Sequence, residues 1–131
     1  MSPDKSKELI DIFPDLYKGS DPRSAIALFG FECGDGWFDL LKELLIEIKA
    51  ICVDNPGITV RVVQVKEKFG GLRFYVDGWN EEVSQLIAEA RGKACFACEN
   101  CGKPSLKQED ENTWEWTVCS EECKAKLRRY E

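Results

Sequence analysis

Two close pairs of cysteines near the end of the chain restrict its fold more than any other feature. Cys98 and Cys101 are separated by two residues, and Cys119 and Cys123 by three. Two thiolates at either spacing can reach one ion, the first pair from a tight turn and the second from the first turn of a helix. Gly102 follows Cys101 and suits the backbone conformation that such a turn needs. The pattern therefore predicts a C-terminal unit organised around four convergent sulfur atoms.

Four thiolates in tetrahedral reach form the ligand set of a structural zinc site. The first residues are too charged for an export signal, so the seven cysteines are expected in a reducing compartment, where close pairs more often bind metal than form disulfides. A redox-active Cys-x-x-Cys would follow a strand and begin a helix, whereas here a predicted helix precedes the first pair. We therefore predict a zinc ion bound by Cys98, Cys101, Cys119 and Cys123.

Cys95 complicates this assignment, because Cys95-Phe-Ala-Cys98 is also a two-residue spacing. Cys95 continues the predicted preceding helix, whereas Cys101 stands against a glycine, so the pair of Cys98 and Cys101 is preferred. Replacing Cys95 by serine is then expected to leave one zinc ion per chain. Cys33 and Cys52 are interpreted as small core residues.

The periodicity of residues 1–94 predicts an α+β core domain, with helices packed on one face of a small antiparallel sheet. Apolar side chains recur every three or four residues from Trp37 to Cys52, which indicates a helix with Asp35 as its N-cap. A second helix is expected after Asn80, which is a credible N-cap with acidic residues behind it.

Residues 58–76 predict a β-hairpin. Apolar and polar residues alternate on both sides of Gly70-Gly71, which is expected to form the turn. The alternation breaks at Val62-Val63, which suggests either a bulge or a strand covered on both faces. Alternating apolar residues at 114–118 predict one more strand. Residues 95–131 are therefore expected to form a zinc-binding subdomain made of a knuckle, a hairpin and a helix.

The composition argues against most catalytic sites. The chain contains no histidine, which removes the commonest general base and every catalytic arrangement built on imidazole. The remaining catalytic candidates are carboxylates near Gly34-Asp35-Gly36 and the charged run Lys66-Glu67-Lys68, but no acid and base are paired at a defined spacing. A polar pocket lined by Asp35, Glu67 and Arg73 would favour an enzyme. Without it, we expect a binding protein that is not an enzyme.

The predicted hairpin offers a candidate partner surface, since basic residues are interleaved with aromatic ones. The net charge of −6 disfavours non-specific binding of a polyanion by the whole molecule, so a protein partner is preferred and nucleic acid is the alternative, bound by the hairpin and the basic C-terminal helix. Acidic residues of the first half, Glu32 and Asp35 among them, could instead meet a basic partner. The partner surface comprises Arg61, Lys66, Lys68, Phe69, Arg73 and Tyr75.

Charged residues interrupt every apolar run, so no membrane span is expected, and the chain is predicted to be cytoplasmic. The oligomeric state is left open by the sequence.

Three stretches carry a resemblance. The first is Gly-Asp-Gly-Trp-Phe-Asp-Leu-Leu at 34–41, the second is Val-Gln-Val-Lys-Glu-Lys-Phe-Gly-Gly-Leu-Arg-Phe-Tyr at 63–75, and the third is the C-terminal four-cysteine knuckle. Together they resemble small uncharacterised proteins encoded by bacteriophages, prophages and bacteria, and the knuckle resembles treble-clef zinc fingers. The resemblance implies no established activity. It implies a bacterial cytoplasm, that of the host if the gene is phage-borne, where many small proteins bind host proteins and some block defence systems.

Overall fold

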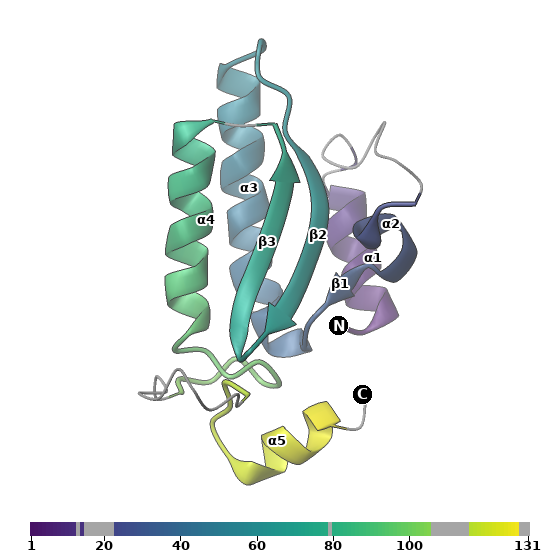
Figure 1. The fold of residues 1–131 in the computed structure, drawn as a ribbon, viewed down its shortest axis with the longest axis vertical. Coiled ribbons are helices and arrows are strands. Elements are labelled where there is room, and N and C mark those ends of the chain that lie inside the picture. The colour runs from purple at the N-terminus through teal and green to yellow at the C-terminus, as the bar shows by residue number, and fades with distance from the viewer. Residues whose placement is uncertain (13, 15–22, 79, 106–115, 129–131) are drawn as a thin grey trace.

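The computed structural model describes residues 1–12, 14, 23–78, 80–105 and 116–128. Its class is α+β, as predicted: helices surround a small three-stranded sheet (Figure 1). Four cysteines of the C-terminal part lie close together. In chain order the elements are α1 (Pro3–Ile12), α2 (Ala25–Phe29), β1 (Phe31–Glu32), the 3-10 turn η2 (Asp35–Trp37), α3 (Phe38–Asp54), β2 (Arg61–Lys68), β3 (Gly71–Asp77), α4 (Glu81–Ala94) and α5 (Glu121–Arg128).

The sheet has the order β1-β2-β3. Strands β2 and β3 form the predicted antiparallel hairpin, whereas β1 pairs with β2 in parallel through Phe31 opposite Val65. The sequence does not predict β1, because a strand of two residues is too short to show a period of two.

The hairpin turn lies one residue earlier than predicted. Lys68 pairs with Gly71, so the two turn residues are Phe69 and Gly70 rather than two glycines. Both have positive φ, 55° at Phe69 and 79° at Gly70, as the type I′ turn of a two-residue hairpin requires. Gly71 is instead the first residue of β3. The error arose because glycine is the usual residue at positive φ, and Phe69 takes that conformation here.

The predicted bulge is confirmed by a register shift between Val62 and Gln64. The extra residue keeps Val62 and Val65 on the same buried face of β2 although they are an odd number of positions apart. As a consequence, Lys66 and its cross-strand partner Arg73 lie on the opposite, outer face.

Helices α3 and α4 pack against each other, and in Figure 1 α3 lies behind the hairpin and α4 to its left. The apolar face of the sheet meets the apolar stripes of these helices. Asn80 caps α4 as predicted, since its Oδ1 accepts from Val83 N at 3.1 Å. Asp35 does not cap α3. It begins the turn η2, and its Oδ1 accepts from Ser2 N at 2.7 Å, so its carboxylate fixes the N-terminal segment instead.

The predicted strand at 114–118 is wrong in its described part, and residues 114 and 115 lie outside the described residues. Residues 116–118 form no regular strand. Their backbone makes separate contacts instead of a ladder: the Thr117 carbonyl accepts from Glu99 N at 2.8 Å, and the Val118 carbonyl accepts from Ser105 Oγ at 2.9 Å. Within the described part of the chain, no helix is long and apolar enough to cross a bilayer.

Candidate metal centre and the adjoining acidic cavity

The first cysteine pair lies in a tight backbone turn. The turn is closed by an isolated bridge between Ala97 and Pro104 and by a hydrogen bond from Cys98 N to Lys103 O at 2.8 Å. Gly102 N donates to Cys98 O, also at 2.8 Å, and Gly102 has a φ of 81°, which L side chains rarely adopt. The glycine after the second cysteine therefore has the role that its position predicts.

The second pair flanks the start of α5. Ser120 Oγ accepts from Cys123 N at 3.2 Å, as an N-cap side chain does, so Cys123 lies in the first turn of the helix. Asn100 Nδ2 donates to Cys123 Sγ at 3.3 Å, and this hydrogen bond lowers the pKa of the Cys123 thiol to about 7. Asn100, in the first pair's turn, thus favours the thiolate of Cys123.

The four predicted ligands come together. The Sγ atoms of Cys98, Cys101, Cys119 and Cys123 all lie within 4.8 Å of one another. Cys119 Sγ is 3.5 Å from Cys101 Sγ and 3.8 Å from Cys123 Sγ. A tetrahedral site with Zn–S bonds of about 2.3 Å requires sulfur atoms about 3.8 Å apart. The donor set and its spacing therefore fit one tetrahedral metal ion.

Cys95 is not part of this group. It ends helix α4 in helical conformation, and its Sγ donates to Arg91 O at 3.4 Å, one helical turn back. The Cys95 thiol is therefore hydrogen-bonded within α4 and is not one of the four converging ligands.

The described residues 95–105 and 116–128, called here the cysteine unit, dock on the turn η2 of the core. Gly36 N donates to Glu99 O at 2.7 Å, and Trp37 Nε1 donates to Ala97 O at 3.0 Å. A Cβ added at Gly36 would collide with the carbonyl oxygen of Cys98 and lie 2.6 Å from Gly102 N. The glycines of the stretch 34–41 therefore let the cysteine turn approach the core backbone.

The hairpin turn forms a second dock. Thr117 Oγ1 donates to Gly70 O at 2.6 Å, and Thr117 O accepts from the backbone of Glu99. The turn of the hairpin and the cysteine turn are therefore joined through a single threonine. Of the three stretches that carry the resemblance, the two in the core, 34–41 and 63–75, therefore both contact the cysteine unit.

The predicted partner residues share one side of the hairpin. The register places Lys66 opposite Arg73, and the strand period puts Lys68 and Tyr75 on the same face. Tyr75 is 46% exposed, and Phe69 is 65% exposed at the turn. Arg61 extends this face at the far end of the hairpin, where it lies opposite Asp77 in the strand register.

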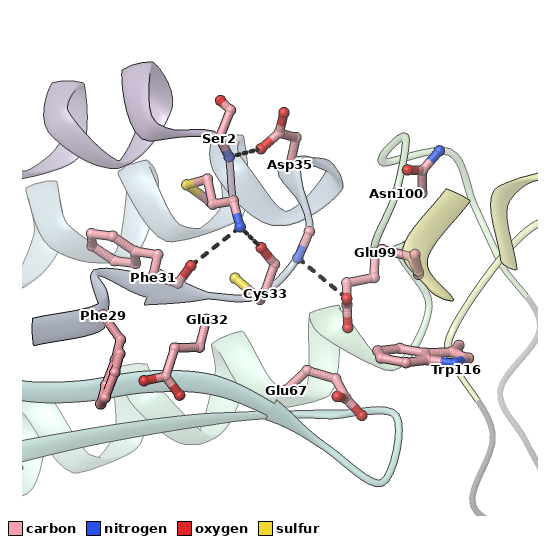
Figure 2. Close-up of a pocket in the computed structure, with 13 residues that line it drawn as sticks. Ser2, Phe29, Phe31, Glu32, Cys33, Asp35, Glu67, Glu99, Asn100 and Trp116 are labelled. Carbon is pink, nitrogen blue, oxygen red and sulfur yellow. Dashed lines mark hydrogen bonds between the residues drawn. The ribbon is translucent and has the colours of Figure 1, made fainter. Parts of the chain in front are cut away.

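A cavity of about 440 Å³ lies between the core and the cysteine unit (Figure 2). Asp35 and Glu67 line it, as an enzymatic site would require, but Arg73 does not. Arg73 lies on the outer face of the hairpin, and its Nη1 donates to Leu72 O at 3.3 Å. The arrangement of acid and base that would favour an enzyme is therefore not assembled. The lining residues are Met1, Ser2, Phe29, Phe31, Glu32, Cys33, Gly34, Asp35, Glu67, Glu99, Asn100, Trp116 and Leu127.

Glu99 is the unexpected residue of this cavity. It is only 1% exposed, and its Oε2 accepts from Gly34 N at 3.2 Å, whereas its Oε1 has no hydrogen-bond partner among the described residues. Burial, together with the nearby carboxylate of Glu67, raises the pKa of Glu99 to about 8. Sequence reasoning missed Glu99, because a glutamate between two metal ligands is expected to face solvent. The one sequence feature that could have indicated its burial is its position in the tight turn between Cys98 and Cys101, which packs on the core.

Cys33 also lines the cavity, and burial raises the pKa of its thiol to about 12. The thiol therefore stays protonated and is a poor nucleophile, which agrees with its interpretation as a core residue. Cys52 packs partly buried against the same core.

No protein-family model, curated protein or solved structure matches the chain.

Proposed function

We propose that the protein is a binding protein without catalytic activity, whose cysteine unit is held together by a structural zinc ion. The convergence of the four Sγ atoms within 4.8 Å carries this proposal. A tetrahedral set of thiolates suits zinc, which prefers soft ligands in this geometry. With sulfur in all four positions no place is left for water, so the ion cross-links two segments and does not activate a nucleophile.

The outer face of the hairpin supports contact with a protein partner. Phe69 projects from the turn, 65% exposed, at a backbone conformation that costs a phenylalanine free energy. Residues held in such conformations cluster at functional sites. Arg73 and Tyr75 lie on the outer face of the same hairpin, and arginine and aromatic side chains dominate the energetics of protein interfaces.

The class of partner is proposed from the resemblance alone. The three stretches described above resemble those of small proteins from bacteriophages, prophages and bacteria, so we propose that this chain acts in a bacterial cytoplasm on a host protein. Inhibition of a host defence system is the form of action that such a setting favours. The treble-clef form of the cysteine unit is part of the same proposal.

Nucleic acid is the second candidate, because Lys66, Lys68 and Arg73 share a face with Tyr75. The negative net charge weighs against it, since most of the surface would repel a phosphate backbone. Binding that falls steeply with salt, measured by mobility shift, would favour this candidate over a protein partner.

The metal is tested by measuring zinc per chain by mass spectrometry in the purified protein. The wild type and Cys95→Ser are expected to contain one zinc ion, and Cys98→Ser to contain none. Loss of zinc from Cys95→Ser, or a wild type that takes up no zinc when the metal is supplied, would overturn the site.

The partner surface is tested with a variant that reverses Lys66, Lys68 and Arg73 to glutamate. Its matched control reverses three exposed lysines on helices, Lys7, Lys49 and Lys93. Partners captured from a bacterial lysate by the wild type and by the control should be absent from the hairpin variant. Identical captured sets from all three proteins would exclude the hairpin as the contact surface.

A further inference from the structure

The cavity between the core and the cysteine unit carries an inference that goes beyond the proposed partner surface. Its volume of about 440 Å³ lies in the range of sites that enclose small organic groups. Four carboxyl side chains line it, those of Glu32, Asp35, Glu67 and Glu99, and no lysine or arginine of the described chain does. The ammonium group of Met1 also lines it, but its hydrogen bonds go to backbone carbonyls of the β1 segment.

An acidic lining alone would not define a site, but Glu99 supplies an independent observation. Its side chain is 1% exposed, and Oε2 accepts from Gly34 N, but in the part of the chain that the structure describes nothing donates a hydrogen bond to Oε1. A buried oxygen without a donor costs free energy of about 1–3 kcal/mol, and native structures rarely tolerate that cost without a reason. A ligand that donates to Oε1 would remove it.

The donor is larger than a metal ion. Among the described residues, the four cysteines are the only group of three or more metal-ligating side chains close enough to hold an ion. The carboxylates of the cavity are spread along its walls instead, with Glu32 near Phe29 and Glu67 near Glu99 (Figure 2). Such spacing suits a cation that presents several N–H groups in different directions.

We propose that this cavity binds a guanidinium group, with Glu99 Oε1 and the Glu67 carboxylate as its acceptors. A guanidinium ion carries five N–H donors in a plane, so it can bridge two carboxylates, and it is weakly hydrated enough to enter a partly apolar site. The ring of Trp116 also lines the cavity, at the end where Figure 2 draws Glu67 and Glu99, and a guanidinium plane stacks on aromatic faces. An ammonium group offers neither the plane nor the second pair of donors.

A guanidinium group can come from a free small molecule or from an arginine side chain of a peptide, and the two sources are separated by the choice of probe. Zinc-loaded full-length protein is titrated calorimetrically with agmatine, with N-acetylarginine amide and with a short peptide containing one arginine. N-acetylcitrulline amide, which has the same shape without the charge, is the matched control ligand. We expect the guanidinium probes to bind with millimolar or tighter affinity and the citrulline compound not to bind. Binding of the peptide alone would identify a peptide as the source, and equal binding of citrulline, or no binding by any probe, would overturn the proposal.

Two substitutions identify the acceptors. Glu99→Gln keeps the shape and the acceptor for Gly34 N but puts an amide NH2 in the place of Oε1, and this NH2 cannot accept from the ligand. Glu67→Gln, in β2 and away from the cysteines, keeps an acceptor for Gly70 N but removes the charge. Each is expected to weaken guanidinium binding by about tenfold or more, because an acceptor or its charge is lost from a desolvated site. Glu43→Gln, on the exposed surface of α3 outside the cavity, is the matched control and should bind like the wild type.

Zinc content is measured on every variant, so failure of this site is distinguished from failure of the metal centre. If Glu99→Gln loses zinc, Glu67→Gln decides the question. Wild-type affinity in Glu67→Gln with zinc retained would overturn the assignment of the acceptors. Lysate capture through the hairpin is a separate experiment, since its residues on the outer face do not line the cavity.

Discussion

The core and the cysteine unit are stabilised by different means. In the core, large apolar side chains such as Trp37, Phe31 and Leu41 are almost completely buried and form one cluster. In the described part of the cysteine unit, the buried hydrophobic residues are Cys98, Cys123 and Leu127, so two of the three are proposed metal ligands. The core can fold by burying apolar surface, whereas the cysteine unit has little to bury and depends on its cross-link.

The difference also shows how the two regions fit together. The core contributes backbone groups to the contact, through Gly36 and through the carbonyl of Gly70, and the cysteine unit contributes a turn and Thr117. Contacts of this kind position a unit but bury little apolar area. We infer that the metal folds the cysteine unit and that the core only orients it.

Removal of the metal gives the largest expected effect. Cys98→Ser, or a strong chelator added to the wild type, should unfold the cysteine unit while the core keeps its structure, because structural zinc contributes about 10–16 kcal/mol of apparent binding free energy. Amide hydrogen exchange should show fast exchange in residues 95–128 and continued protection in α3 and β2. Cys95→Ser is the control and should exchange like the wild type. Uniform loss of protection throughout the chain would show that the core depends on the cysteine unit.

A cavity in the core should have the reverse effect. Leu41 is fully buried, so Leu41→Ala is expected to lower the free energy of unfolding by about 2–5 kcal/mol in urea, with zinc still bound below the transition. Leu28→Ala removes the same atoms from a side chain that is 60% exposed and should change stability little. Zinc loss from folded Leu41→Ala would contradict the separation of the two regions.

The contact between η2 of the core and the cysteine turn should be weakened by adding a single methyl group at Gly36. Gly36→Ala forces the Cys98–Gly102 backbone away and is expected to cost about 1–3 kcal/mol, as overpacking does. Because the four sulfur atoms do not move relative to one another, zinc should be retained, while the indole N–H of Trp37 loses its bond to Ala97 and shifts in an NMR spectrum. Gly57→Ala, where an added Cβ would meet nothing within 4 Å, is the control. If the Trp37 indole signal is unchanged in Gly36→Ala, the cysteine turn does not contact the core at Gly36.

The sequence predicts what depends on local pattern. The helices α3 and α4, the hairpin with its bulge, and the grouping of the four cysteines all follow from short-range spacing, and the structure contains them. The prediction that Asp35 caps α3 was wrong, because its carboxylate accepts a hydrogen bond from the backbone of Ser2, a residue far from it in sequence. The strand β1 and the buried Glu99 were missed for the same reason: each is defined by a partner that only the folded chain brings near.

Relief of backbone strain at the hairpin turn gives the smallest expected effect and the one most informative about function. Phe69 has a φ of 55°, a conformation that asparagine tolerates better than phenylalanine, and Asn-Gly is the preferred type I′ turn. Phe69→Asn should therefore raise stability by about 0.5–1 kcal/mol, even after loss of the contact between its ring and Lys68 Nζ at 5.5 Å. Thermal unfolding should show a midpoint higher by a few degrees.

Phe69→Ala removes the ring but leaves an L side chain at the same positive φ, so it should give no such gain. If the proposed partner surface is correct, both variants lose the captured partner, and only the asparagine variant is more stable. If Phe69→Asn is more stable and still captures the partner, the exposed Phe69 ring is not part of the contact surface.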